Sequence, residues 1–109
     1  MDEVPLEISI EELDRMRNEG EPHTLLDIRE PHELRISALS GSLDIPMGSV
    51  PERLDELPRE GTIAVLCRTG NRSMKVTMWL REQGYDGATN VGGGINAWAE
   101  RIDPSLPQY

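Results

Sequence analysis

The sequence predicts a three-layer α/β/α fold with a central, mostly parallel sheet of about five strands flanked by helices. Short apolar segments alternate with segments of helical spacing along the chain, which is typical of strands joined by crossover helices. Residues 63–66 are apolar at consecutive positions, the pattern of a central strand covered on both faces. The chain has 109 residues, enough for one hydrophobic core, so we expect a single domain over residues 1–109.

Capping residues predict the first helix. Ser9 and Glu12 fit a capping box, in which a hydroxyl and a carboxylate each accept a backbone N–H at a helix start. We expect this helix to reach Asn18 and to be ended by Gly20.

The next elements are a strand, a short helix, a weaker strand and a second helix. Residues 24–28 are short, apolar and rich in strand formers, and Pro31 then suits a first helical turn. Residues 43–46 form the weaker strand candidate. Residues 50–57 repeat apolar positions at helical spacing before Pro58.

A longer helix follows the central strand. One side of this helix contains Val76, Trp79, Leu80 and Gln83. Gly84 can end it with a positive φ. Met74, Met78 and Trp79 have the spacing of residues that pack on a sheet, so we expect all three in the core.

The last part of the chain repeats the alternation. Residues 88–91 predict a strand, and Gly92, Gly93 and Gly94 open a final helix that continues to Arg101. Two prolines then make residues 103–109 an extended C-terminal tail.

Composition and charge exclude several function classes. With 37% hydrophobic and 28% charged residues, the chain is globular rather than disordered. Its net charge of −9 disfavours nucleic acid and anionic membranes as partners. The longest aliphatic run, residues 63–66, is too short for a membrane span, and the acidic start lacks the order of a secretory signal. We therefore expect a cytoplasmic protein.

The single cysteine, Cys67, is the candidate for chemistry. It has no disulfide partner, and no second Cys or close His pair offers a zinc spacing, so neither a metal nor a cofactor is expected. Cys67 directly follows the most apolar strand, at the end of the sheet where ligands of parallel sheets bind. If the loop amides after it turn inward, they form an anion nest, reinforced by the dipole of the next helix. Gly70 and Asn71 tolerate the tight backbone that such a loop requires.

The charge near Cys67 is opposite to that of the whole chain. Residues 67–75 contain Arg68, Arg72 and Lys75 and no acid, so this segment carries +3 and the other residues −12 of the total −9. Thiols beside Arg or Lys and at helix N-termini have lowered pKa values. The alternative is a buried, inert cysteine. The loop favours a reactive thiol.

These residues give the chain a resemblance to the rhodanese family in its single-domain form. The resemblance is carried by four segments, at residues 25–33, 41–46, 67–73 and 92–98. The most specific are Leu-Leu-Asp-Ile-Arg-Glu-Pro, which begins at Leu25, and the loop Cys-Arg-Thr-Gly-Asn-Arg-Ser, which begins at Cys67. Where the family usually reads Gly-His-Ile-Pro-Gly-Ala, residues 37–42 read Ser-Ala-Leu-Ser-Gly-Ser, so the shape of that segment should differ.

The resemblance implies a sulfurtransferase with ping-pong kinetics. Cys67 would take the outer sulfur of thiosulfate, release sulfite, and pass the sulfur from a persulfide to a thiophilic acceptor such as cyanide or a thiol. It further implies a substrate-binding loop of Arg68, Thr69, Gly70, Asn71, Arg72 and Ser73. The amides of residues 68–72 would hold the outer sulfur, the two arginines would attract the thiosulfate dianion, and the Thr69 and Ser73 hydroxyls would donate hydrogen bonds. Two arginines favour thiosulfate over mercaptopyruvate.

Three other functions compete with this interpretation. Cysteine phosphatases and arsenate reductases place five residues between Cys and Arg, whereas only four separate Cys67 from Arg72, which suits a sulfur atom better than a phosphate. The glycines at 92–94 loosely fit a dinucleotide fingerprint, but too little chain follows for that fold. A sulfur-relay module that exchanges sulfur with a sulfur-carrier or persulfide-donor protein remains the alternative to a metabolic enzyme.

The remaining polar residues receive structural roles. Asp27, Arg29 and Glu30 are expected to form ion pairs rather than to act as acids or bases. His23 and His32 are expected on the surface, because nothing in the sequence pairs either one with Cys67.

Overall fold

A five-stranded sheet forms the centre of the computed structural model, which describes residues 3–109. The strands are β1 (Glu7–Ile8), β2 (Thr24–Asp27), β3 (Leu43–Asp44), β4 (Ile63–Leu66) and β5 (Ala88–Val91). They lie in the order β1-β5-β4-β2-β3, and every pairing is parallel. The predicted α/β fold is confirmed, with β4 in the middle and a sheet that is parallel throughout.

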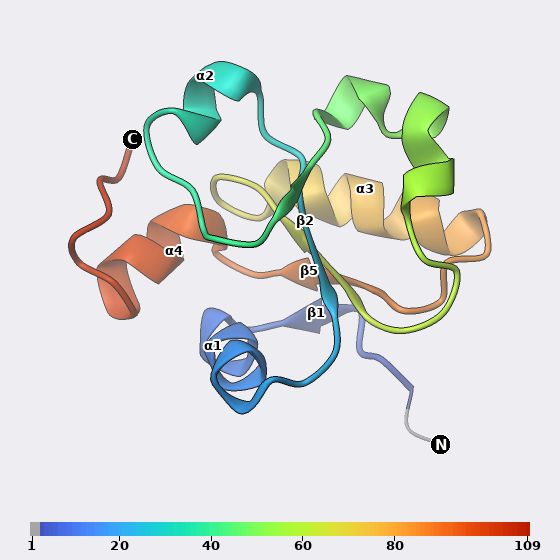
Figure 1. Ribbon diagram of the computed structural model, residues 1–109, viewed down its shortest axis with the longest axis horizontal. Helices are drawn as coiled ribbons and strands as arrows, with labels where there is room; N and C mark the ends of the chain where they lie inside the picture. Colours follow the sequence, from blue (N-terminus) through green and yellow to red (C-terminus); the bar gives the residue numbers. More distant parts are fainter. Residues whose placement is uncertain (1–2) are drawn as a thin grey trace.

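Helices cover both faces of this sheet (Figure 1). The α-helices are α1 (Ile10–Glu19), α2 (Pro31–Leu34), α3 (Asn71–Glu82) and α4 (Gly94–Arg101), and the 3₁₀ helices are η1 (Met47–Ser49) and η2 (Pro51–Glu56). The buried residues of α1 and α4 pack in one core cluster, and those of α3 pack in the other. No helix within residues 3–109 has both the length and the apolar character needed to cross a membrane.

The alternation of side chains along β4 decides which face holds Cys67. Ala64 and Leu66 belong to the cluster under α1 and α4, whereas Val65 and Cys67 belong to the cluster under α3. Successive side chains of a strand point to opposite faces. Cys67 therefore lies at the carboxyl end of the central strand, on the side of the helix that begins a few residues later.

The start of α1 forms one of the two hydrogen bonds of the predicted capping box. The Ser9 hydroxyl accepts the Glu12 N–H at 3.0 Å, and Gly20 ends the helix in the left-handed conformation. The Glu12 carboxylate instead binds the Arg15 guanidinium at 2.7 and 2.8 Å. Ion pairing within the helix thus replaces the return bond to the cap.

Two predictions about local structure were wrong, and one strand was missed. β1 was not predicted, because a two-residue edge strand carries almost no pattern. The expected helix over residues 50–57 is η2, in which Arg53 leaves helical geometry with φ −115° and ψ 22°. Met78 is 52% exposed rather than in the core, because α3 buries the side that contains Ser73, Val76, Thr77 and Leu80.

Candidate active site

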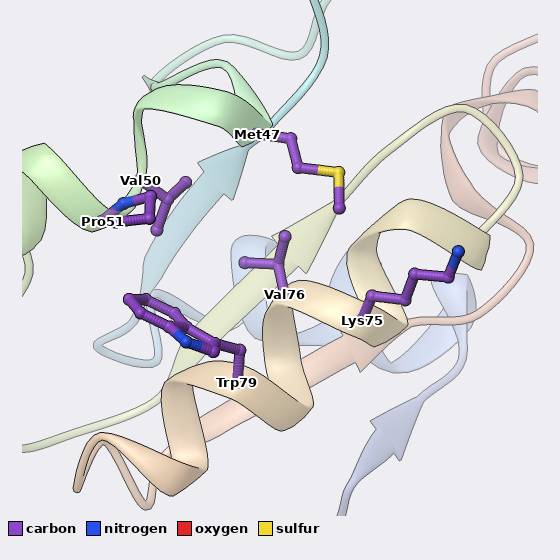
Figure 2. A pocket seen from close by; sticks show the side chains of 6 residues that line it. All are labelled: Met47, Val50, Pro51, Lys75, Val76 and Trp79. Carbon is purple, nitrogen blue, oxygen red and sulfur yellow. The ribbon is translucent and has the colours of Figure 1, made fainter.

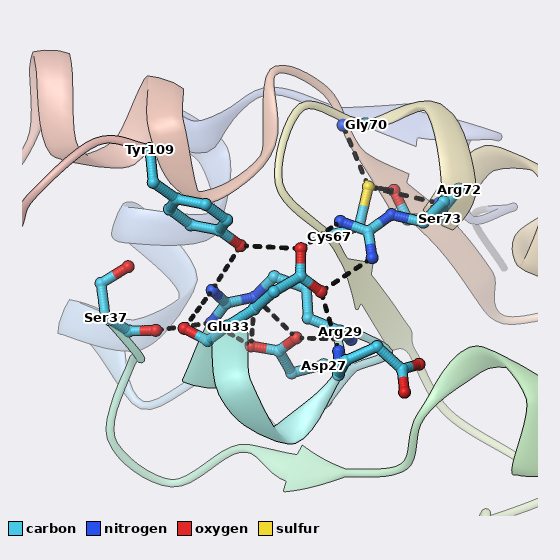
Figure 3. Close-up of polar contacts among 10 residues, drawn as sticks. Asp27, Arg29, Glu33, Ser37, Cys67, Gly70, Arg72, Ser73 and Tyr109 are labelled. Carbon is cyan, nitrogen blue, oxygen red and sulfur yellow. Dashed lines mark hydrogen bonds and ion pairs between the residues drawn. The ribbon is translucent and has the colours of Figure 1, made fainter. Parts of the chain in front are cut away.

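The sulfur of Cys67 accepts backbone hydrogen bonds from the loop that follows β4 and from the start of α3 (Figure 3). The Gly70 N–H donates to Sγ at 3.1 Å and the Ser73 N–H at 3.4 Å, and the Ser73 hydroxyl lies 3.2 Å from Sγ. Ser73 lies one residue beyond the 68–72 stretch from which amide donors were expected. Two of these contacts come from the first turn of α3, where the helix dipole is positive.

Two opposing effects act on the Cys67 thiol. Burial raises its pKa, since only 1% of the residue is exposed. The contact with the Ser73 hydroxyl and hydrogen bonds from the backbone of Ser73, Gly70 and Thr69 outweigh burial, so the pKa lies below its ordinary value. The thiol is therefore buried, as the inert interpretation requires, yet held in a polar cradle that stabilises the thiolate.

The start of α4 fixes the backbone of this cradle. The Ile95 N–H donates to the Cys67 carbonyl at 2.9 Å, and the Asn96 N–H donates to the Arg68 carbonyl at 3.1 Å. Gly70 turns the loop with φ 101°, and a Cβ there would lie 3.1 Å from the Gly93 nitrogen. The glycines at 92–94 thus permit a tight approach to the loop that contains the cysteine.

Arg72 forms an ion pair with Glu33, and the sequence did not predict this contact. Its two terminal nitrogens bind the Glu33 oxygens at 2.8 and 2.9 Å, across 39 residues of chain. This contact lowers the pKa of Glu33 to about 2; burial opposes the shift and the Glu30 N–H supports it. One of the two arginines expected to attract a dianion is therefore already paired, and α2 is tied to the start of α3.

Glu33→Gln is expected to destabilise the fold at neutral pH by on the order of 1 to 3 kcal/mol, since a hydrogen bond to a charged group is weakened. The folded pKa of Glu33 is about 2 and its ordinary value 4.5, so its stabilisation is complete above pH 4.5. As pH falls from 4.5 towards 2, wild type and variant should converge in urea unfolding. Glu56→Gln, which weakens the exposed Arg53–Glu56 pair, is the control and should show little difference at any pH.

A buried ion pair between Asp27 and Arg29 helps to hold α2 in place. The Arg29 guanidinium binds the Asp27 carboxylate at 2.8 Å, and both side chains are fully buried. Arg29 also donates to the carbonyls of Glu33 and Ser37 and to the Tyr109 hydroxyl. These contacts agree with the expected structural role of Asp27 and Arg29, whereas Glu30 is exposed and has no ion-pair partner within residues 3–109.

The C-terminal tail, expected to be extended, returns to the site. The Tyr109 hydroxyl donates to Glu33 at 3.2 Å, and its ring lies 5.1 Å from the exposed Arg68 guanidinium. The side-chain amide of Asn96 donates to the Tyr109 carbonyl and accepts a hydrogen bond from the Tyr109 N–H. The tail thus contacts both the Arg68 guanidinium and the Glu33 carboxylate.

The other predicted loop residues and histidines do not contact the sulfur through their side chains. Thr69 and Asn71 are exposed, as is His32 on α2. His23 is half-buried and its Nδ1 lies 2.7 Å from the Glu21 carbonyl.

A hollow of about 260 Å³ lies between α3 and the two 3₁₀ helices (Figure 2). Its apolar lining comes from Met47, Val50, Pro51, Val76 and Trp79. Lys75 adds a positive charge at its edge. Trp79, expected in the core, is half-buried and forms part of this wall.

Comparison with known proteins decides the family. A family profile described as "Rhodanese-like domain" matches residues 9–101. The chain belongs to the rhodanese family of sulfurtransferases. This rhodanese is 37% identical over 93 residues to a sulfurtransferase of Allochromatium vinosum, covering 85% of this chain and 87% of that protein.

Longer proteins and solved structures share the same domain. "Adenylyltransferase and sulfurtransferase MOCS3-2" of Zea mays is 38% identical over 109 residues, covering 94% of this rhodanese but only 23% of the maize protein. A rhodanese-related protein of Thermoplasma volcanium has a TM-score of 0.80 at 31% identity and covers 94% and 96% of the two chains. A rhodanese-like domain protein of Staphylococcus aureus has a TM-score of 0.82 at 28% identity, covering 96% and 99%.

Sequence reasoning missed three residues of the site, namely Glu33, Asn90 and Tyr109. Asn90 donates to the Gly70 carbonyl at 3.2 Å and accepts from the Ser73 hydroxyl. Each reaches the loop from a distant element, and a lone Glu, Asn or Tyr gives no motif. The one available signal was at Asn90, an amide side chain within a short strand segment that also contains Thr89.

Proposed function

We propose that this rhodanese transfers sulfane sulfur from thiosulfate, or a related donor, to a thiophilic acceptor such as cyanide or a thiol. The Cys67 thiolate attacks the outer sulfur, and the S–S bond of thiosulfate breaks as the new S–S bond forms. The electron pair of the broken bond leaves with sulfite. The acceptor then attacks the outer sulfur of the persulfide, and Cys67 departs again as a thiolate.

The cradle around the sulfur is the observation that supports this proposal. The Gly70 and Ser73 amides stabilise the thiolate both as nucleophile and as leaving group. No step requires a general base once the thiol is ionised. Arg68 is exposed, and its positive charge would attract an anionic donor.

The proposal is tested by intact-mass analysis after incubation with thiosulfate. We expect the mass of one added sulfur atom, which cyanide removes with formation of thiocyanate. A protein that gains no sulfur from thiosulfate or from a small persulfide would refute the proposal.

A sulfur relay between proteins is the second candidate function. It is favoured by the maize relative, whose name joins adenylyltransferase to sulfurtransferase, although this chain spans about a quarter of that protein. The partner would be a sulfur-carrier or persulfide-donor protein. Saturation by thiosulfate at low millimolar concentration favours the enzyme, whereas tight binding of a persulfide-bearing protein favours the relay.

Arg68→Ala is expected to lower kcat/KM for thiosulfate by up to about fivefold at low ionic strength, because an exposed charge contributes about 1 kcal/mol at most. The dependence of the rate on salt should also weaken. The matched control is Arg59→Ala, since Arg59 also lies over a tyrosine ring but precedes β4 rather than following it. Equal rates for wild type and Arg68→Ala at every ionic strength would contradict this role.

A further inference from the structure

A series of hydrogen bonds runs from the sulfur to the edge strand β1. The Ser73 hydroxyl, 3.2 Å from Cys67 Sγ, donates to Asn90 Oδ1 on β5. Asn90 Nδ2 donates to Glu7 Oε1 at 2.8 Å and to the Gly70 carbonyl at 3.2 Å. Ser73 and Asn90 are almost fully buried, so water does not readily replace these contacts.

The partners of Asn90 fix the orientation of its amide. Glu7 and Gly70 both offer oxygen acceptors, so the NH₂ group must face them and Oδ1 must face Ser73. A hydroxyl has a single hydrogen, and Ser73 directs it to Asn90 Oδ1. The side of the Ser73 oxygen that faces Cys67 therefore carries lone pairs, which accept from a neutral thiol.

An ionised Cys67 competes for the same hydrogen. If the Ser73 hydroxyl turns towards the thiolate, Asn90 Oδ1 is left buried without a donor, which is unfavourable. If it does not turn, the thiolate keeps only its amide donors. In both cases the thiolate is less stable than it would be if the Ser73 hydroxyl were not bound to Asn90.

We propose that Asn90 is a positioning residue that holds the Ser73 hydrogen away from Cys67 and thereby sets how readily this thiol ionises. The inference rests on the proposed function, in which Cys67 is the nucleophile. In the persulfide, Sγ is no longer an anion, and the Ser73 hydrogen is fully available to Asn90. The Ser73–Asn90 bond therefore favours the sulfur-loaded protein over the free thiolate.

Charged groups from several elements surround this network. Arg72 of α3 acts on Cys67 electrostatically and is paired with Glu33 of α2. Arg68 lies over the Tyr109 ring of the tail, and Glu7 of β1 binds the far side of Asn90. Substituting Asn90 by an apolar residue alters none of these charges, so a resulting shift reports the hydrogen bonds.

The test is the pH dependence of iodoacetamide alkylation, which reports Cys67 alone because the chain has one cysteine. Asn90→Leu is expected to lower the midpoint of the profile by about one pH unit, since the Ser73 hydroxyl becomes free to donate to the thiolate. In a Ser73→Ala background the same substitution should leave the midpoint unchanged. This double-mutant cycle isolates the action of Asn90 through Ser73.

Thr89→Val is the matched control, because Thr89 neighbours Asn90 on β5 and its buried hydroxyl has no hydrogen-bond partner within residues 3–109. It should leave the alkylation profile unchanged. Asn90→Ala replaces Asn90→Leu if circular dichroism shows that leucine is not accommodated. A midpoint that rises, stays constant, or falls equally without Ser73 overturns the proposal. Alkylation needs no sulfur donor, so this outcome is separate from a failure of sulfur transfer, which the mass analysis detects.

Discussion

Cys67→Ser is expected to lower sulfur transfer by on the order of 10³-fold or more, the scale on which loss of an enzymatic nucleophile acts. Serine keeps a side chain of similar shape that accepts the Gly70 and Ser73 N–H groups. Its hydroxyl does not ionise near neutral pH, so the cradle has no anion to stabilise. Steady-state thiocyanate formation measures the loss, and intact mass after thiosulfate should show no added sulfur.

The fold should survive this substitution with a change in unfolding free energy of about 1 kcal/mol or less, the size of an ordinary conservative change. Cys67→Ala is the companion variant. It removes both the nucleophile and the acceptor, so the Gly70 and Ser73 amides lose a buried partner and the fold should be less stable than with serine. Turnover retained in either variant would remove Cys67 from the reaction.

The elements with strong local signals were predictable from the sequence. β4 is apolar at every position and α1 has an N-terminal cap, so both were found at nearly the correct bounds. β1 and η2 were not, because the pairing of β1 with β5 and the departure of Arg53 from helical geometry arise from packing. Local pattern predicts elements that bury a whole face, and it fails for short segments whose structure depends on distant partners.

The same distinction applies to the site. The loop amides around Cys67 could be predicted because loop, cysteine and helix start are consecutive in the chain. The Glu33–Arg72 pair and the Tyr109 contact with Arg29 could not, since they join residues 39 and 80 positions apart. The excess of positive charge counted in residues 67–75 is consequently smaller in the folded protein, because Glu33 pairs with Arg72.

Gly94→Ala is expected to destabilise the fold by on the order of 3 kcal/mol and to lower kcat/KM about a hundredfold. Gly94 has φ 62°, which costs an L-residue about 1 to 2 kcal/mol. Its Cβ would also lie 2.5 Å from the Cys67 carbonyl oxygen and against the Arg68 carbonyl, where overpacking costs about 1 to 3 kcal/mol. Relief of this clash must move α4 or the cysteine loop, and a displacement of about 1 Å can cost about 10²-fold in rate.

Two control glycines separate the cost of the positive φ from the cost of the Cβ clash. Gly41 has φ 80° and open space around its Cβ position, so Gly41→Ala should show the backbone cost with little loss of activity. Gly48 has open space and no positive φ, so Gly48→Ala should stay within about 0.5 kcal/mol of wild type. Urea unfolding and thiosulfate turnover measured on all three variants test the argument. If Gly94→Ala resembled Gly41→Ala in both, close approach of α4 to the backbone of Cys67 and Arg68 would not be what holds the sulfur cradle in place.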